Sequence, residues 1–303
     1  MARVSSAGAA LERIAVTAVS WPLLSRIVGR LSDLHLPRAL RVAAIRAYAR
    51  AYGVDLEEAA LPPAAYPTFN TFFTRRLRDG ARPIETASEV VVSPSDSRLS
   101  SIGRVPADGR LDQVKGETYG VDALLGSAED AARFRAGQHA TLYLSPAMYH
   151  RVHSPVDGEI VAWRYLPGRL FPVNAAGVCS VPGLFTRNER VVVSVETVAH
   201  GSVAIVLVGA ANVGRISLAF AELVTNRGYA PGFFQPPAPI PIRRGDELGI
   251  FHLGSTVVLL VADPGLVLAA HAGEPVRMGR ALWRRAVRGG EAAASERTRD
   301  RSA

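Results

Sequence analysis

The stretch Phe251–Val261, FHLGSTVVLLV, decides the expected fold. Its second half, Thr256–Val261, is a β-branched and apolar run typical of a buried strand. Ser255 stands at the entrance of that strand, directly after Gly254. Because glycine has no side chain to block a hydroxyl, Ser255 could attack the preceding peptide bond and cut the chain there. A plain strand entrance with a small turn is the ordinary alternative, so the rest of the chain must decide.

Short β-rich segments bounded by Gly and Pro continue this pattern through the later part of the chain, at 141–144, 159–165, 190–197 and 203–208. Before them, apolar residues recur at helical spacing from Ala10 to Tyr52, with breaks at Pro22 and near Pro37. The predicted fold class is α+β, a helical N-terminal region followed by a mainly β, barrel-like or sandwich-like body. We expect a helical region at 1–60, a β-rich catalytic domain at 61–288 and a disordered tail at 289–303.

Composition narrows the class of protein. The chain has 303 residues, 48% of them hydrophobic, which predicts a substantial core and excludes general disorder. The net charge of +8 favours an anionic partner, either nucleic acid or a lipid surface. A single cysteine, Cys179, excludes an intrachain disulfide and a multi-cysteine zinc site. No run approaches the roughly 20 apolar residues of a spanning helix, and no signal peptide is expected.

Two N-terminal segments could contact an anionic partner. The helices of Ala10–Tyr52 are amphipathic and carry Arg13, Arg26 and Arg30, so they could lie in a membrane interface or pack on their own domain. The segment Leu61–Pro83 mixes Phe69, Phe72 and Phe73 with Arg75, Arg76, Arg78 and Arg82. Aromatics among arginines could suit single-stranded nucleic acid, but the periodicity favours one helix that docks its phenylalanines on the core.

Three further clusters carry polar side chains beside turn-forming residues. Asp96 lies in SPSDS, where an aspartate would ordinarily cap the local backbone. His150 and His153 lie in YHRVHSPVDG, and no further ligands at matching spacing support a metal site. The third cluster, RRGDELG at 243–249, reads as a tight turn that Asp246 and Glu247 shape.

An aspartate, a histidine and a serine far apart in sequence can assemble as orienting acid, general base and nucleophile. Asp96, His153 and Ser255 would serve this geometry in that order. The chain has 7 histidines and 27 acidic residues, so residue types alone give the triad little weight.

Read together, these segments resemble the phosphatidylserine decarboxylases, the self-processing pyruvoyl enzymes of phospholipid synthesis, in their bacterial membrane-associated form. The resemblance runs in one order over about 69–260, through FNTFFTRRLRDGARPI, SPSDS, KGETYGVDALL, YLSPAMYHRVHSPVDGEI, LPGRLFPVN, LFTRNERVV, VGAANVGRI and RRGDELGIFHLGSTV. The family usually has glycine after the aspartate of the second block. Here that position is Ser97, which leaves the local turn geometry open.

The resemblance implies that Gly254–Ser255 is the self-cleavage site of a zymogen, with Asp96 and His153 as the charge relay that activates Ser255. Ser255 would become a covalent pyruvoyl group, and no metal is implied. That group would form a Schiff base with phosphatidylserine, so that the enzyme releases CO2 and phosphatidylethanolamine. His150 would serve decarboxylation, and which histidine returns the proton stays open.

The implied partners are phosphatidylserine, the phospholipid membrane, and the large and small chains for each other. A homo-oligomer stays open, and no nucleic acid is expected. The implied location is peripheral, at the cytoplasmic side of the cell membrane, where the N-terminal helices and a loop with Phe233 and Phe234 could touch lipid.

Three other functions compete with this one. A serine hydrolase would use Asp96, His153 and Ser255 without cutting its own chain. A family relative could act on another amino-headgroup. A lipoyl-type carrier would require a lysine on a hairpin, and the single lysine, Lys115, lies elsewhere.

Overall fold

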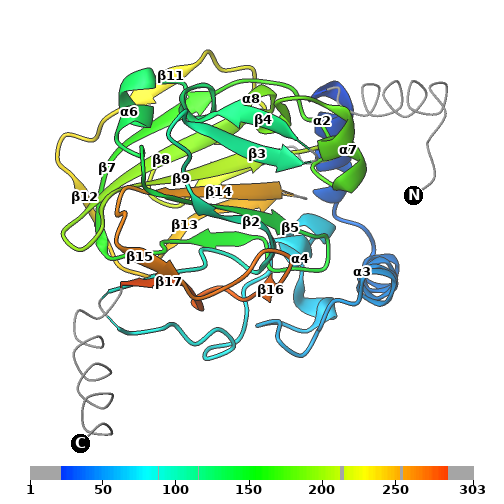
Figure 1. The fold of residues 1–303 in the computed structure, drawn as a ribbon. Helices are drawn as coiled ribbons and strands as arrows, with labels where there is room; N and C mark the ends of the chain where they lie inside the picture. Colours follow the sequence, from blue (N-terminus) through cyan, green and yellow to red (C-terminus); the bar gives the residue numbers. More distant parts are fainter. Residues whose placement is uncertain (1–21, 88, 115, 212–214, 253–254, 286–303) are drawn as a thin grey trace, which may run out of the picture.

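The computed structural model describes residues 22–87, 89–114, 116–211, 215–252 and 255–285, and within the first helix it describes side chains from Ile27 onward. Helices α2, α3, α4 and α7 lie on one side of the molecule, α6 and α8 lie along its top edge, and strands form most of the rest (Figure 1). The helical segments are α2 (Pro22–Ser32), α3 (Arg38–Tyr52), η1 (Pro63–Ala65), α4 (Phe69–Phe73), α5 (Val121–Leu125), α6 (Ala128–Ala132), α7 (Ala175–Ser180) and α8 (Leu184–Arg187).

The largest sheet of the described chain has nine strands, all paired antiparallel. Its order is β11 (Gly232–Phe234), β7 (Gly158–Leu166), β8 (Arg190–Thr197), β9 (Gly201–Gly209), β14 (Ser255–Val261), β5 (Gln138–Leu144), β2 (Ser97–Arg104) and β16 (Pro275–Val276), and β12 (Ile240–Ile242) also pairs with β7. All five strands predicted from sequence are present. The described strands close no barrel, so the barrel-like form of the prediction is wrong: the sheet ends in strands of two or three residues.

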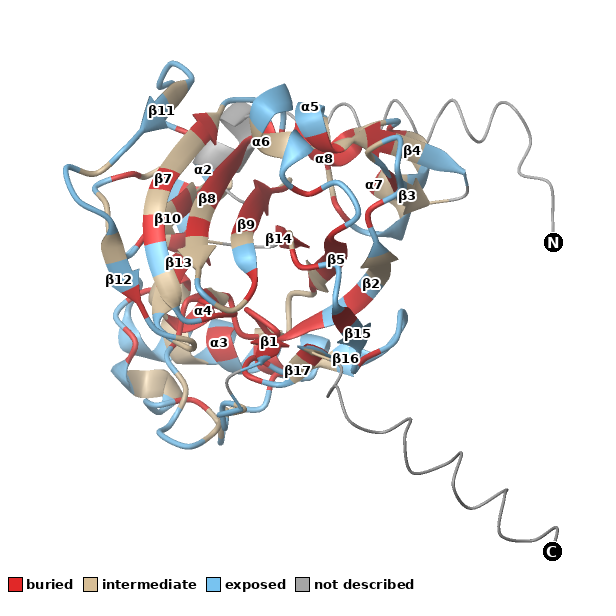
Figure 2. Cartoon of the chain, turned by 60° about the vertical axis from the view of Figure 1, so that its left-hand side comes forward, coloured by how far each residue is buried: buried red, intermediate tan, exposed pale blue. Residues whose placement is uncertain are grey.

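Strand β14 lies in the middle of this sheet, between β9 and β5, and every one of its residues is buried (Figure 2). Val257, Leu259 and Val261 belong to one hydrophobic core, whereas Val258 and Leu260 belong to a second. Because successive side chains of a strand point to opposite faces, the sheet separates two cores. This explains why the sequence of β14 is continuously apolar.

Smaller sheets and short helices cover the two faces. The first core includes residues from the sheets β1 (Val90–Val92), β17 (Ala281–Arg285), β15 (Leu266–Leu268) and β10 (Arg215–Leu218), β13 (Glu247–His252), β6 (Arg151–His153). The second core includes residues of α5, α8 and the two-stranded sheet β3 (Arg110–Val114), β4 (Glu117–Gly120). The mainly β α+β fold is confirmed.

The N-terminal helices have one packed side and one exposed side. The break near Pro37 is confirmed, since α2 ends at Ser32 and α3 begins at Arg38. On α3, Ile45 and Ala49 pack with Val54, Tyr66 and Phe72. Several large apolar side chains of this region are exposed: Ile27, Leu31, Leu34, Leu36 and Leu40. In the described chain, no helix is both long and apolar enough to cross a bilayer.

The segment rich in phenylalanine and arginine forms α4, as the sequence predicted. The Thr68 hydroxyl caps the helix by accepting a hydrogen bond from the Thr71 N–H. In return, the Thr68 N–H donates a hydrogen bond to the Thr71 hydroxyl. Phe72 and Phe73 are buried. Residues 1–21 and the predicted tail at 289–303 lie outside the described residues, as does Lys115.

Candidate active site

Ser255 is the first residue of β14 and lies opposite Leu144 of β5 and Gly209 of β9. Its hydroxyl is buried and has no hydrogen-bond partner in the described part of the chain. A buried hydroxyl without a partner loses its hydration without compensation, which costs roughly 1–3 kcal/mol. Such a cost is common at reactive positions. Gly254, the other half of the predicted cleavage site, lies outside the described residues.

The loop Ser145–His150 continues directly from the strand β5 that faces Ser255. At its end, the backbone carbonyl of His150 accepts a hydrogen bond from the Phe251 N–H of β13 at 3.0 Å. The loop therefore connects the partner of β14 to the strand that precedes Ser255. This places His150 and Ser255 at the same end of the central sheet.

The His150 ring is completely buried and lies against Phe73, with 4.1 Å between the ring centroids. Its Nδ1 is 2.8 Å from the Met148 carbonyl oxygen, so Nδ1 carries the proton and Nε2 the lone pair. Nε2 is buried and has no partner among the described residues. Burial lowers the pKa of His150 to about 3, and the charge of Arg75 acts in the same direction. The ring is therefore neutral at neutral pH.

His153 ends β6 and has both ring nitrogens occupied. Nδ1 is 2.7 Å from the Gly245 carbonyl oxygen, and Nε2 is 3.0 Å from the Tyr149 hydroxyl. Burial lowers the pKa of His153, while the Gly245 contact and the charges of Glu247 and Asp96 oppose that effect. Tyr149 is thus the direct side-chain partner of His153, and Asp96 acts on it through space.

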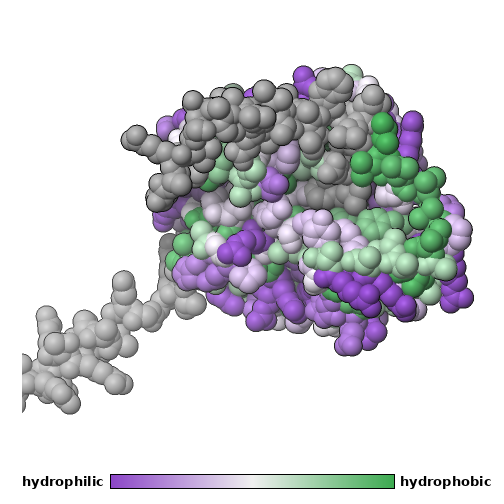
Figure 3. Space-filling model, turned by 90° about the vertical axis from the view of Figure 1, so that its right-hand side faces the viewer, coloured by the Kyte–Doolittle hydropathy of each residue, from purple (hydrophilic) through white to green (hydrophobic). Residues whose placement is uncertain are grey.

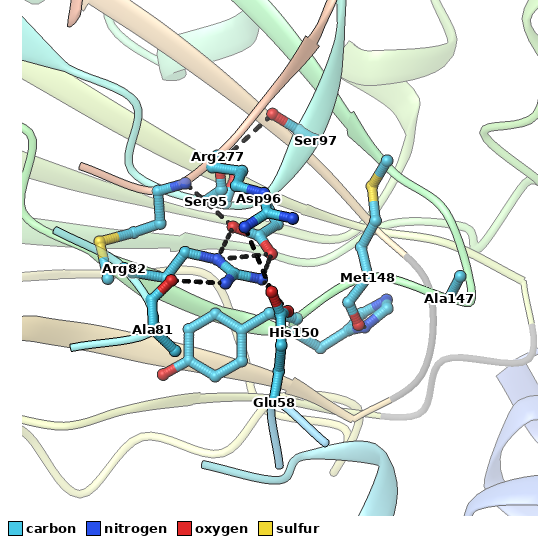
Figure 4. A network of polar contacts seen from close by, with 12 residues as sticks. Glu58, Ala81, Arg82, Ser95, Asp96, Ser97, Ala147, Met148, His150 and Arg277 are labelled. Carbon is cyan, nitrogen blue, oxygen red and sulfur yellow. Dashed lines mark hydrogen bonds and ion pairs between the residues drawn. The ribbon is translucent and has the colours of Figure 1, made fainter. Parts of the chain in front are cut away.

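The Asp96 carboxylate is held by other groups (Figure 4). Arg82 donates from Nε to Oδ1 at 2.8 Å and from Nη2 to Oδ2 at 2.6 Å, and the Met278 N–H donates to Oδ1 at 2.9 Å. Arg82 also donates to Glu58 at 2.7 Å. The backbone joins Asp96 to the histidine strand, because the His153 N–H donates to the Pro94 carbonyl oxygen at 2.8 Å.

The structure therefore places His150 at the end of the central sheet that carries Ser255 and joins Asp96 to His153 through the backbone, but it does not link Asp96, His153 and Ser255 in a hydrogen-bonded triad. No direct hydrogen bond joins Asp96, His153 and Ser255, all three of which are described. Of the two predicted site histidines, His150 is the one with a buried ring nitrogen that has no partner among the described residues.

Ser97 does not disturb the turn that contains Asp96. It begins β2, it is buried, and it is not among the described residues with positive φ. Because its backbone avoids the left-handed region, serine fits where the family usually has glycine.

The turn before β13 behaves as predicted for Asp246, whose Oδ2 accepts a hydrogen bond from the Arg243 N–H. Gly245 has a φ of 89°, which favours glycine there. Glu247 instead pairs with Arg151 at 2.7 Å. The turn also supplies the carbonyl that orients His153, a role that a side-chain pattern cannot reveal.

Sequence reasoning missed Arg82, Tyr149 and His252 as residues of this region. Tyr149 stands next to His150 in the sequence, but nothing local distinguishes it from a core aromatic. Arg82 lies 14 residues before Asp96 in a segment with three other arginines. His252 contacts Asn70 through Nδ1 and the Ser217 hydroxyl through Nε2 at 3.1 Å, and both partners are distant in sequence.

Comparison with known proteins identifies the family. The family model described as phosphatidylserine decarboxylase matches residues 69–284, which include all four predicted site residues. The chain belongs to the phosphatidylserine decarboxylase family.

Three relatives of this family, each named phosphatidylserine decarboxylase proenzyme, cover most of the chain. That of Anaeromyxobacter sp. (strain K) is 49% identical over 80% of this chain and 86% of its own length. That of Myxococcus xanthus (strain DK1622) is 46% identical over 78% and 84%, respectively. That of Bordetella avium (strain 197N) is 44% identical over 86% and 90%, respectively. The resemblance read from the sequence blocks is confirmed.

Burial of His252 predicts a measurable pH dependence of stability. Burial lowers its folded-state pKa from 6.5 to about 4, and the charge of Arg215 adds to this. Between these values the unfolded chain binds more protons, so stability falls as the pH drops from 6.5 toward 4. His252→Gln removes this contribution and should reduce the slope of unfolding free energy against pH by up to about 1.4 kcal/mol per unit. Urea unfolding at a series of pH values measures it, and an unchanged slope would contradict the assignment.

Proposed function

We propose that this chain is a phosphatidylserine decarboxylase that forms its own reactive ketone by cutting the Gly254–Ser255 bond. The observation that carries the proposal is the buried, unpartnered Ser255 hydroxyl at the mouth of the central strand, within the region that matches the family. The relatives' names, which call them proenzymes, support self-processing. The products of the reaction would be CO2 and phosphatidylethanolamine.

The cleavage uses groups of this chain and one water molecule. The Ser255 hydroxyl gives its proton to a base as Oγ attacks the Gly254 carbonyl carbon, the C–N bond breaks, and the released amine takes up a proton. The resulting ester is lost when a base removes the Ser255 α-proton and the Cβ–Oγ bond breaks, which releases the Gly254 carboxylate. The dehydroalanine left behind tautomerises, water adds, and ammonia departs, so the small chain begins with a pyruvoyl group.

Ser255 fits this role because its hydroxyl has no hydrogen-bond partner among the described residues, so its conversion breaks no hydrogen bond to them. A pyruvoyl group at this position supplies a ketone that can condense with an amine and accept the electron pair left when CO2 departs. Ser255 would provide the carbon atoms and the acyl oxygen of this group and water its ketone oxygen, and the group would stay covalently bound to the small chain.

In the proposed cleavage, His153 is the base and Asp96 supports it electrostatically. The negative charge of Asp96 raises the pKa of His153 and so favours the imidazolium that forms when the serine proton is taken. Arg82 and the Met278 N–H donate hydrogen bonds that fix the position of the Asp96 carboxylate. His153 has to exchange its Tyr149 contact for the serine proton, which makes Tyr149 a candidate relay.

His150 is assigned to decarboxylation. Its Nε2 lone pair is buried and unpartnered in the described chain, so it is free to take and return a proton in the site. A neutral ring also avoids an electrostatic attraction that would hold the substrate carboxylate in its ground state.

The two chains produced by cleavage should stay together. The small chain would begin with β14, whose seven residues are all buried between β9 and β5 of the large chain. Apolar burial of this kind stabilises by about 25 cal/mol per Å². The active protein is then a heterodimer of its own two chains.

The exposed apolar side chains at the N-terminal end give the protein a means to reach its lipid. Ile27, Leu31, Leu34, Leu36 and Leu40 are exposed on α2, α3 and the turn between them. Figure 3 views this side of the molecule and shows hydrophobic areas beside hydrophilic ones. Phe233 and Phe234 are also exposed. We propose that the protein is peripheral, at the cytoplasmic side of the membrane, with the helical apolar side chains inserted into the lipid interface.

Ser255→Ala tests self-cleavage. The variant lacks the attacking hydroxyl, so it should remain one chain and release no CO2 from phosphatidylserine. Thr256→Ala removes the next buried, unpartnered hydroxyl, which lies on the other face of the strand, and should still yield two chains. Denaturing mass spectrometry of both proteins distinguishes the outcomes. A cleaved Ser255→Ala protein would rule out the scheme. A wild-type protein that stays one chain and shows catalytic activity would support a serine hydrolase or another use of Ser255.

His153→Gln and His150→Gln separate the two halves of the function. His153→Gln removes the proposed base and should slow self-cleavage by about 100-fold or more, which is the usual contribution of a general base. His150→Gln should be cut into two chains but lose CO2 release by a similar factor. A time course on a denaturing gel, followed by CO2 release from the purified cut protein, measures the two steps. The reverse pattern would exchange the two assignments.

Replacing Leu31, Leu34 and Leu36 by serine tests the membrane contact. If these side chains insert into the interface, binding to anionic liposomes should fall about tenfold or more. The control replaces Val267 and Leu268 of β15 by serine. Their exposure is comparable to that of the three leucines, and the change should leave liposome binding unchanged. Liposome flotation provides the readout. Equal effects of the two replacements would argue against a specific N-terminal contact.

A further inference from the structure

Arg75 is the arginine just after α4, and it is almost entirely enclosed without an anionic partner. Its residue exposure is 4%. Nη2 donates to the Ala147 carbonyl oxygen at 3.1 Å, and the guanidinium lies 5.3 Å from the centre of the Phe72 ring. Nε and Nη1 are both buried and have no hydrogen-bond partner among the described residues.

The nearby carboxylates are already bound to other arginines (Figure 4). Asp96 is held by Arg82, and Glu58 is held by Arg82 and Arg277. Glu247 pairs with Arg151, which also donates to the Thr74 carbonyl oxygen next to Arg75. Arg75 is buried and has no carboxylate contact in the described chain, and it lacks the four backbone carbonyl acceptors that satisfy the equally buried Arg190.

Such an arrangement is costly for the folded protein. A guanidinium loses its hydration on burial, and only a paired anion or a full set of hydrogen bonds compensates for that loss. The carbonyl of Ala147 and the Phe72 ring satisfy one part of the guanidinium only. The N–H groups on Nε and Nη1 that lack an acceptor indicate that an anionic group of a ligand binds there.

Arg75 is also tied to the candidate catalytic loop. Ala147, its hydrogen-bond acceptor, lies in the same loop as His150, three residues before it. Phe73, two residues before Arg75, lies against the His150 ring. The end of α4 therefore contacts His150, and Arg75, just after it, contacts the same loop through Ala147.

We propose that Arg75 binds the phosphodiester of the phosphatidylserine headgroup, an inference that rests on the proposed function. The headgroup carries two anions, the phosphodiester and the carboxylate that is lost. An arginine bound to the carboxylate would stabilise the ground state and oppose the loss of CO2, since that charge moves away in the transition state. The phosphodiester keeps its charge throughout, so Arg75 can bind it without such a penalty.

This assignment has a distinct kinetic signature. Uniform binding of substrate and transition state changes KM and leaves kcat unaltered. Arg75→Met should raise KM for phosphatidylserine roughly 10- to 100-fold, the range expected for lost hydrogen bonds to a charged group, and change kcat less than about twofold. Phosphatidylethanolamine keeps the phosphodiester but lacks the carboxylate, so its inhibition constant should rise by the same factor.

The matched control is Arg76→Met. Arg76 is the next residue, its side chain is 71% exposed, and its loss changes the net charge equally. Assays in neutral detergent mixed micelles of phosphatidylserine, with CO2 release as the readout, should give wild-type KM for this variant. An equal rise in KM for both variants would overturn the proposal in favour of general charge attraction. A rise in KM without a rise in the phosphatidylethanolamine inhibition constant would overturn it in favour of the carboxylate.

Folding is followed separately. Arg75→Met should still be cut into two chains, and its Tm should not fall, because it removes an unpaired buried charge. Arg82→Met, which leaves the buried Asp96 carboxylate without its arginine, should lower Tm by about 6 °C or more. A lower Tm for Arg75→Met with unchanged KM would show a structural role only. Arg75→Lys retains a charge and should give a smaller rise in KM, which tests the proposal again should the methionine variant fold poorly.

Different results would contradict the proposed function and the Arg75 assignment. If the wild-type protein releases no CO2 from phosphatidylserine, the proposed function is wrong and the Arg75 assignment falls with it. If the wild type is active and Arg75→Met keeps both the wild-type KM and the wild-type inhibition constant, only the Arg75 assignment is wrong.

Discussion

The burial of β14 on both faces is the constraint on which the structure depends. Alternate side chains of this strand enter two separate hydrophobic cores, and neighbours on either side satisfy its backbone. If this strand slipped by one residue, every side chain would turn to the other face, so that Val257 would enter the core that now holds Val258. Its register, and with it the position of Ser255 at its first residue, is therefore fixed by packing rather than by contacts of the serine itself.

The same constraint organises the residues around Ser255. Strand β5 pairs with β14 along its whole length, so the loop that follows β5 must begin opposite Ser255. That loop ends at His150, whose backbone is bonded to β13, the strand that leads back toward Ser255. Strand β6 then pairs with β13 and carries His153. The two histidines are therefore three residues apart on one path of paired strands, with His150 opposite the end of β13 and His153 opposite its start at Glu247.

The sequence was sufficient where the signal is local. The apolar run of β14, the helix with Phe72 and Phe73, and the break before Arg38 each follow from neighbouring residues, and the structure has all three. The clamp of Arg82 on Asp96 and the contact of Tyr149 with His153 could not be predicted, because they arise from how distant segments pack. The barrel-like form was wrong for a related reason: strand propensity does not reveal which strands end a sheet.

Burial also sets the electrostatics of the site in a way that suits the proposed chemistry. Removing water disfavours every unpaired charge, so it makes His150 neutral and leaves Arg75 in need of an anion. A carboxylate brought into the same environment loses its hydration, and its departure as neutral CO2 relieves that cost. A phosphodiester held by the buried guanidinium would compensate for the entry of the headgroup. On this view, one dry region at the end of the central sheet both protects the serine that is converted and favours the loss of charge that the converted group promotes.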